Sequence, residues 1–166
     1  MVAGHGRHYQ VETPEGRQIH VLPRGKKSEA VVGDRVVWMP TNATGDEGVL
    51  ESIEPRRNLL YRQDEWRTKS FAANLDRLLV LVAAEPVFSE SQLARALISA
   101  EQAGIEVLIL LNKVDLLPYL RFDVAACMAN ARRVNPGIRI IQVSATNDQG
   151  MDEWLAWIDQ GVQAAR

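Results

Sequence analysis

Residues 105–115 read IEVLILLNKVD, and this stretch decides the fold of the second half of the chain. The run from 105 to 111 is almost wholly apolar, and residues 78–82 (LLVLV) form an earlier run of the same kind. Such continuous runs are typical of strands that are buried on both faces of a parallel sheet. The polar group Asn112-Lys113-Val114-Asp115 follows the second run directly, so we expect it at the carboxyl end of a strand.

Helical patterns alternate with these apolar runs. Ser89 is suited to cap a helix over 92–103, and Gly104 is suited to end it. The other elements expected here are a strand over 138–143 and helices over 122–134 and 151–165. The order β-α-β-α-β-α predicts an α/β layer with a parallel sheet and flanking helices.

Short strands separated by turn residues fill the first half of the chain. The predicted strands cover residues 8–11, 17–22, 31–39, 48–53 and 59–61. The turn sequence Thr13-Pro14-Glu15-Gly16 joins the first two as a hairpin. Several short strands within about 60 residues favour a small barrel of the OB type. The alternative is an unspecialised β-barrel that only packs against its neighbour.

A change of composition divides the chain into two parts. Residues 55–70 are charged and irregular, which predicts a linker or a mobile loop, and apolar runs dominate after them. We therefore expect an α+β chain of two domains. An OB-fold β-barrel is expected over 1–68, and a partial α/β domain over 69–166.

The composition excludes several classes of protein. The 166 residues are 46% hydrophobic and 24% charged, as in a globular protein, and the net charge of −2 argues against coating nucleic acid by bulk charge. The apolar runs are too short to span a bilayer, and residues 1–7 lack the apolar core of a signal peptide. The single cysteine, Cys127, excludes an internal disulfide and a zinc site of several cysteines. These features favour the cytosol and no membrane partner.

The group from Asn112 to Asp115 is suited to recognising a guanine base. The Asp115 carboxylate can accept two parallel hydrogen bonds, from the ring N–H and the exocyclic amino group, and adenine cannot supply that pair. The stem of Lys113 can lie along the base, and Asn112 can bond the imidazole edge or tie neighbouring loops together. The alternative for Asp115 is that it caps the helix after the loop.

Ser144-Ala145-Thr146 follows the next predicted strand, 32 residues after Asn112. A small residue there lets a backbone N–H approach the base oxygen, while Ser144 braces the loop. The alternative for Ser144 is a plain turn at the end of a strand. Because ligands bind outside the carboxyl ends of parallel strands, both groups are expected at one crevice. The predicted nucleotide-binding residues are Asn112, Lys113, Val114, Asp115, Ser144, Ala145 and Thr146.

The motifs that hold phosphates and magnesium do not precede these two groups. The sequence has no Gly-x-x-x-x-Gly-Lys-Ser/Thr and no Asp-x-x-Gly, and Gly25-Lys26-Lys27 lacks the hydroxyl that would hold magnesium. In the usual order of GTPases the phosphate loop comes first. The base-recognition motifs therefore stand in a reversed order.

This reversed order resembles a circularly permuted GTPase of the ribosome small-subunit-dependent GTPase A family (RsgA, also called YjeQ). The residues that carry the resemblance are Gly6-Arg7, the segment from Gly33 to Trp38, Glu47-Gly48-Val49, the segment from Ile53 to Arg56, Ala72-Ala73-Asn74-Leu75-Asp76, the segment from Asn112 to Asp115, and Ser144-Ala145. The resemblance implies an OB-fold, a permuted P-loop GTPase domain and a C-terminal zinc finger. It also implies GTP or GDP with Mg²⁺, and a cytoplasmic role in late maturation of the small (30S) ribosomal subunit.

The resemblance places Arg166 just before the family's phosphate loop, so we expect the sequence to be a piece of a longer protein. Zinc is expected only in the part of the family that lies beyond this sequence. No catalytic residue and no metal ligand is assigned here, and these residues alone are expected to be inactive. A bare edge of the parallel sheet would favour self-association.

Basic residues in the first half are candidates for contacts with ribosomal RNA. They are Arg7, Arg24, Lys26, Lys27, Arg35, Arg56 and Arg57. Their alternative role is an ordinary solvated surface. An alternative function for the whole sequence is a non-catalytic RNA-binding module, in which the α/β part is only a scaffold.

Overall fold

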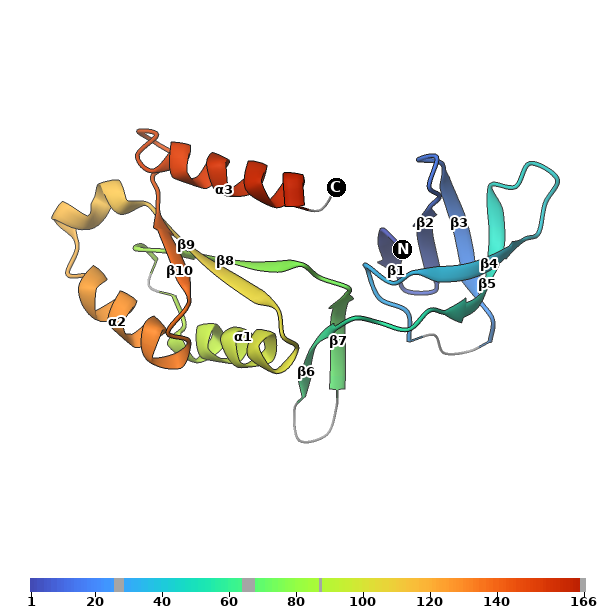
Figure 1. The fold of residues 1–166 in the computed structure, drawn as a ribbon, viewed down its shortest axis with the longest axis horizontal. Helices are drawn as coiled ribbons and strands as arrows, with labels where there is room; N and C mark the ends of the chain where they lie inside the picture. Colours follow the sequence, from blue (N-terminus) through green and yellow to red (C-terminus); the bar gives the residue numbers. More distant parts are fainter. Residues whose placement is uncertain (26–28, 64–67, 87, 165–166) are drawn as a thin grey trace. The chain divides into compact units, whose positions relative to one another are not determined.

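The computed structural model describes residues 1–25, 29–63, 68–86 and 88–164. The chain forms two compact units, Met1–Asp76 and Arg77–Arg166. The first unit is an OB-like β domain and the second is an α/β domain, as the sequence predicts (Figure 1). The boundary between the units lies after Asp76, eight residues beyond the one expected at 68/69. The strand that ends at Ala73 belongs to the first unit, because the Ala73 amide donates to the Val32 carbonyl at 2.9 Å.

A five-stranded sheet makes up most of the first unit. Its strands are β1 (Ala3–His5), β2 (His8–Glu12), β3 (Gln18–Pro23), β4 (Val36–Pro40) and β5 (Glu47–Ile53). They lie in the order β1-β2-β3-β5-β4, and β3 and β5 run parallel while the other neighbours are antiparallel. Alternate residues of β2 and β3 point inward, so polar positions face out and apolar positions form the core. The core comprises Tyr9, Val11, Ile19, Val21 and Leu50.

The prediction that 55–70 is a linker or mobile loop is wrong for residues 59–63 and 68–70, and its residues 64–67 lie outside the described residues. Leu59–Gln63 (β6) and Thr68–Ala73 (β7) form an antiparallel ribbon, with a bulge between Leu60 and Tyr61. Most ribbon residues remain partly or fully exposed. The strand expected over 59–61 is confirmed as part of β6. The strand β7 was not predicted, because neither face of the ribbon is buried in a core and its residues show no alternation of apolar and polar positions.

The loop before β4 is fixed to the rest of the first unit by a buried ion pair. The Asp34 carboxylate is fully buried and accepts hydrogen bonds from Arg56 Nε at 2.7 Å, Arg56 Nη2 at 2.8 Å and the Val31 amide at 2.8 Å. Burial raises the pKa of Asp34, but the Arg56 and Val31 hydrogen bonds and the Arg56 charge outweigh it and hold that pKa below its ordinary value. Gly33 beside it has φ +89°, and an added Cβ would lie 2.0 Å from the Ala73 carbonyl oxygen.

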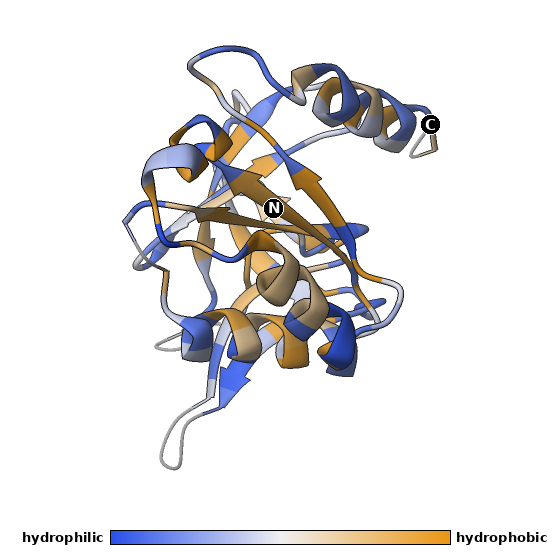
Figure 2. Cartoon of the chain, turned by 90° about the vertical axis from the view of Figure 1, so that its left-hand side faces the viewer, coloured by the Kyte–Doolittle hydropathy of each residue, from blue (hydrophilic) through white to orange (hydrophobic). Residues whose placement is uncertain are grey.

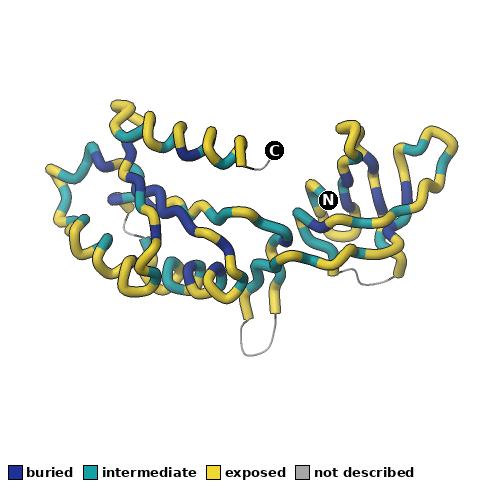
Figure 3. The backbone as a smooth tube through the Cα atoms, in the orientation of Figure 1, coloured by how far each residue is buried: buried dark blue, intermediate teal, exposed yellow. Residues whose placement is uncertain are grey.

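The second unit is a three-stranded parallel sheet with helices on both faces. Its elements are β8 (Arg77–Ala83), α1 (Glu90–Gln102), β9 (Glu106–Asn112), the 3₁₀ helix η1 (Val114–Tyr119), α2 (Val124–Val134), β10 (Arg139–Gln142) and α3 (Met151–Ala164). The strand order is β10-β9-β8, and α3 lies on the face opposite α1 and α2 (Figure 1). The strands are strongly hydrophobic and β9 is buried along most of its length, while the helices mix polar and apolar residues (Figures 2 and 3).

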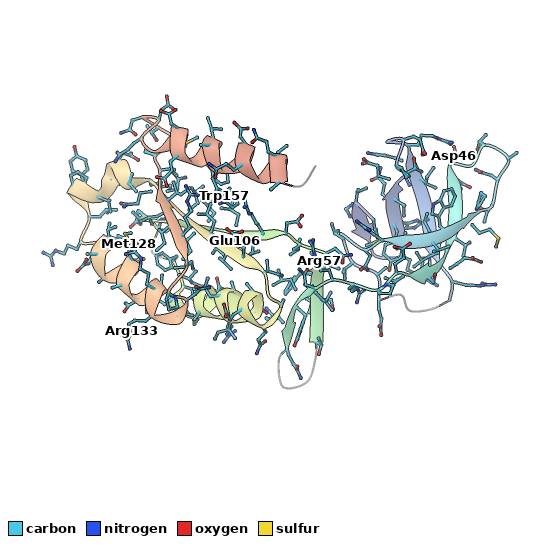
Figure 4. All side chains as sticks on the ribbon, viewed as in Figure 1. Asp46, Arg57, Glu106, Met128, Arg133 and Trp157 are labelled. Atoms are coloured by element: carbon cyan, nitrogen blue, oxygen red, sulfur yellow. The ribbon has the colours of Figure 1, made fainter. Side chains whose placement is uncertain are left out.

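Helix boundaries follow the capping residues in the sequence. Ser89 Oγ accepts from the Gln92 amide at 3.4 Å, which confirms Ser89 as the cap of α1. Asp123 caps α2 by accepting from the Ala126 amide at 2.9 Å, so α2 begins at Val124 and not at the expected position 122. Trp157 points from α3 toward the sheet and packs with Leu108 and Ile141 (Figure 4). No helix among the described residues is long and apolar enough to cross a membrane.

Candidate functional site

The turn after β9 carries the first predicted group in an unusual backbone conformation. Lys113 has φ +61° and ψ +35°, the left-handed region, which costs a residue with a Cβ about 1–2 kcal/mol. Asn112 Oδ1 offsets part of this cost by accepting from the Lys113 amide at 2.7 Å. The Lys113 side chain is exposed, while Val114 is 4% exposed and anchors the turn in the core. Strain at a loop that follows a buried strand indicates a functional constraint.

The turn after β10 is braced by Ser144, as the sequence predicts. Ser144 is fully buried, its Oγ accepts from the Thr146 amide at 3.2 Å, and its own amide donates to the Gln149 carbonyl at 2.9 Å. Ala145 and Thr146 remain exposed. A rigid turn thus presents a small side chain and backbone to solvent at the carboxyl end of the sheet.

Asn112 ties the two turns together, which is one of the two roles expected for it. Its Oδ1 also accepts from the Ala145 amide, at 3.4 Å, and its carbonyl accepts from the Ala84 amide at 3.1 Å. A backbone bond from the Val114 amide to the Val143 carbonyl at 3.2 Å reinforces the contact. The ends of β8, β9 and β10 therefore meet at one edge, where ligands of parallel sheets bind.

Asp115 is the unusual member of this group because one of its oxygens lacks a partner. Its Oδ1 is buried and accepts no hydrogen bond from the residues that the structure describes. The alternative, in which Asp115 caps the following helix, is not what the structure has: Lys113 is the N-cap of η1, and no side-chain hydrogen bond caps that helix. A shielded, unpaired acceptor costs about 1–3 kcal/mol, so a ligand that offers donors here is favoured.

Sequence reasoning missed the residues that complete the second turn. Asp148 has φ +61° and Gly150 has φ +72°. A Cβ on Gly150 would lie 2.0 Å from the Gln142 carbonyl oxygen, so only glycine fits without displacing the turn. The Asn147-Asp148-Gln149-Gly150 string is a turn signal that could have indicated this bend.

The predicted basic residues of the first unit differ in their availability. Arg35 is exposed, Arg7 donates to the Gly25 carbonyl at 3.2 Å, and Arg24 lies 3.7 Å from Glu51 in an exposed pair. Arg57 pairs with Asp76 at 2.6 Å and is 59% exposed (Figure 4). Lys26 and Lys27 lie outside the described residues.

Arg56 is a different case from the other predicted arginines. It is held by Asp34 and also donates to the Glu29 carbonyl at 2.8 Å. Phosphate contacts would compete with these bonds, and the expected role of Arg56 in RNA binding stays a prediction.

Metal binding has no support from side-chain clusters. Within residues 1–25, 29–63, 68–86 and 88–164, no group of three or more His, Cys, Asp or Glu side chains is placed to hold an ion. The polar groups at the two turns are one carboxylate, an amide side chain and backbone amides. This mixture of hydrogen-bond acceptors and donors suits the polar edge of a base better than it suits Mg²⁺.

Comparisons with known proteins connect this geometry to one family. Residues 53–164 match the model described as RsgA GTPase. The chain is 54% identical over 149 residues to the small ribosomal subunit biogenesis GTPase RsgA of Variovorax paradoxus (strain S110), covering 89% of this chain and 45% of that protein. It is 46% identical over 156 residues to the protein of the same name from Bordetella pertussis, covering 94% of this chain and 50% of that protein.

A solved structure is similar to this chain in fold. YjeQ from Thermotoga maritima matches with a TM-score of 0.62 and 26% sequence identity, over 94% of this chain and 54% of that chain. The chain thus spans about half the length, or less, of the relatives it matches.

Proposed function

The chain belongs to the RsgA GTPase family, which confirms the resemblance found in the sequence, and we propose that it supplies the guanine-recognition part of a GTPase. The relatives are named small ribosomal subunit biogenesis GTPases. GTP hydrolysis and a role in biogenesis of the small (30S) subunit are proposed for the protein to which this stretch belongs. The observation that carries the proposal is the buried Asp115 oxygen without a partner, at the edge where two braced turns meet.

Each residue of the site has a proposed role. Asp115 accepts from the ring N–H and the amino group of guanine, displacing the atoms that now cover its Oδ1. The Ala145 amide, whose bond to Asn112 Oδ1 is long at 3.4 Å, would turn to the base oxygen, and the stem of Lys113 lies along the base plane. Asn112 and Ser144 are positioning residues, because they hold the turns and not the ligand.

The phosphates and metal ions of the reaction are assigned to no residue of this sequence. Mg²⁺ bound to the nucleotide would neutralise phosphate charge in hydrolysis. The zinc that the resemblance implies belongs to a part of the family beyond this stretch. These residues bind the base and set its orientation, so hydrolysis by this stretch alone is not expected.

The proposed partners are guanine nucleotide and the small ribosomal subunit with its rRNA, in the cytoplasm. Exposed Arg7, Arg24 and Arg35 support contacts between the OB-like unit and RNA phosphates. A non-catalytic RNA-binding module stays the second candidate, and this exposed basic surface is the observation that favours it.

Self-association is a further part of the proposal. In the described sheet, β8 is an edge strand, and it exposes Leu79 by 40% and Leu81 by 62%. Apolar residues on an open edge favour strand pairing with another copy. Light scattering during gel filtration is expected to show a dimer fraction that falls when Leu81→Lys is introduced, and an unchanged monomer for both proteins would contradict this.

Nucleotide titration followed by NMR tests the central proposal on the chain as it is. We expect GMP to shift the Ala145 and Thr146 amide signals at lower concentration than AMP, by roughly 5- to 150-fold, since a bidentate base contact is worth about 1–3 kcal/mol. The amide of Gly16, in a turn of the first unit, serves as the unaffected control. Equal responses to GMP and AMP would contradict guanine recognition.

A further inference from the structure

A groove between two helices of the second unit has no role in guanine recognition. It has a volume of about 470 Å³ and lies between α1 and α2, which cover the same face of the sheet (Figure 1). Cavities that hold small molecules typically measure about 300–1,000 Å³. The groove shares no residue with the turns at Asn112 and Ser144, so a ligand in it would be separate from a bound base.

The walls of this groove are largely apolar, and short side chains keep it open. Helix α1 presents one face to the groove, because its lining residues are spaced at i, i+3, i+4 and i+7. They are Glu90, Leu93, Ala94 and Leu97. The lining residues along α2 are mostly small: Ala126, Cys127, Asn130, Ala131 and Val134. Side chains of this length do not fill the space between the two helices, which leaves room for the body of a ligand.

Two aromatic rings line the end of the groove at which both helices begin. Phe88 stands immediately before Ser89, the N-cap of α1, and Phe122 stands immediately before Asp123, the N-cap of α2. The two ring centroids are 6.1 Å apart and the ring planes are inclined by 62°, so the rings meet edge to face. An aromatic face attracts a cation that lies within about 6 Å of its centroid. This end of the groove therefore offers a surface that suits a positive charge.

The charged residues of the lining favour a cation at the same end. Glu90 and Asp123 are the two carboxylates among the described lining residues, and Arg121 is the one basic residue. Asp123 already accepts from the Ala126 amide at 2.9 Å, whereas Glu90 has no hydrogen bond or ion pair with any residue that the structure describes. Burial raises the pKa of the Cys127 thiol above its ordinary value, and the charge of Glu90 raises it further. The negative charge of Glu90 therefore acts inside the groove.

We propose that the groove between α1 and α2 binds a small organic cation with an apolar body, and that its ammonium group lies between Glu90 and the rings of Phe88 and Phe122. The apolar body packs against Leu93 and Leu97 on the α1 wall. Amines and quaternary ammonium ions meet both requirements, because a carboxylate attracts their charge and aromatic faces bind the methyl or methylene groups that carry it. This site is independent of the proposed guanine recognition.

Three probes with the same benzyl body test which charge the groove prefers. Benzyltrimethylammonium is a cation, benzyl alcohol is neutral and phenylacetate is an anion. In NMR titrations of the full 166-residue chain, we expect benzyltrimethylammonium to shift the Leu93 and Ala126 amide signals at about 2- to 30-fold lower concentration than benzyl alcohol, because a cation–π contact is present only with the cation. Phenylacetate is expected to bind most weakly. Equal affinity for the three probes, or a preference for phenylacetate, would overturn the proposal.

Substitutions in the lining are expected to act in opposite directions. Glu90→Gln keeps the size of the side chain but removes its charge, so we expect benzyltrimethylammonium to bind about 2- to 5-fold more weakly. Phe122→Leu keeps an apolar side chain but removes an aromatic face, so we expect binding about 2- to 30-fold weaker. Arg121→Gln removes a charge of the same sign as the ligand, and binding is expected to be retained or strengthened.

Matched controls lie outside the lining of the groove. Asp152→Asn removes a carboxylate from the first turn of α3, and Tyr119→Leu removes an aromatic ring that is 85% exposed; both variants are expected to bind the cation like the wild type. Circular dichroism shows whether Phe122→Leu remains folded, and Glu90→Gln, at an exposed position, decides the matter if it does not. If Glu90→Gln binds benzyltrimethylammonium as tightly as the wild type does, the proposal is overturned.

Discussion

Asp34 in the first unit and Asp115 in the second both bury carboxylate oxygens, but their surroundings differ. Asp34 accepts three hydrogen bonds from Arg56 and Val31, so the fold itself satisfies it. Asp115 Oδ1 is buried with no partner among the described residues. A buried polar group that the fold satisfies stabilises one conformation, whereas one left unpaired is suited to a ligand. The same residue type thus serves stability in one unit and, in the proposed function, recognition in the other.

The largest expected effect comes from breaking the ion pair of the first unit. Arg56→Met leaves the Asp34 carboxylate buried and unpaired, which typically costs about 3–5 kcal/mol of unfolding free energy. Arg57→Met is the matched control, because its pair with Asp76 is exposed and such pairs contribute about 0–1 kcal/mol. Urea unfolding measures both. Equal losses for the two variants would show that burial of Asp34 is not what makes its pair matter.

Two glycines extend the comparison between the units with a smaller effect. Gly33→Ala and Gly150→Ala each place a Cβ 2.0 Å from a carbonyl oxygen at positive φ, and such strain costs about 1–3 kcal/mol. We expect Gly150→Ala also to weaken GMP binding, because the turn that carries Ala145 must move, while Gly33→Ala leaves GMP binding unchanged. Thermal unfolding together with the NMR titration distinguishes them. A Gly150→Ala protein with unchanged GMP affinity would show that the position of this turn does not affect GMP binding.

The pH dependence of stability is expected to be smaller and to come from the first unit. The pKa of Asp34 is lowered in the folded state, so its contribution is complete above its unfolded pKa of about 3.9 and is lost as pH falls through the folded value. Each unit of pKa lowering corresponds to about 1.4 kcal/mol. Melting temperatures measured between pH 7 and pH 2 are expected to fall more steeply in the wild type than in Asp34→Asn. Parallel curves would contradict this assignment.

The sequence predicted the second unit better than the first, for physical reasons. Strands β8 and β9 are continuous apolar runs, and the Ser89 cap and Gly104 mark the ends of α1. Buried strands and capped helices can therefore be recognised from the sequence. Of the β6–β7 ribbon only residues 59–61 were predicted as a strand, because its faces stay exposed and its charged residues look like those of a loop. Strand β1, only three residues long, was also missed.

The site divides in the same way. The turns at Asn112 and Ser144 were predictable because polar motifs follow apolar strands, and the Asn112–Ala145 contact agrees with one expected role. The ion pair between Arg56 and Asp34 was not predictable, since the two residues are 22 apart in sequence and meet only in the fold.

Base preference of Asp115→Asn tests the central claim most directly. The amide presents a donor where the carboxylate accepted from the guanine N–H, and it can instead donate to the oxygen that xanthine carries in place of the amino group. Competition between GMP and XMP, read from the Ala145 amide, is expected to show roughly ten- to a hundredfold weaker GMP binding and a preference moved toward XMP, with an unchanged melting temperature. If Asp115→Asn keeps wild-type affinity for GMP, the unpaired oxygen does not read the base.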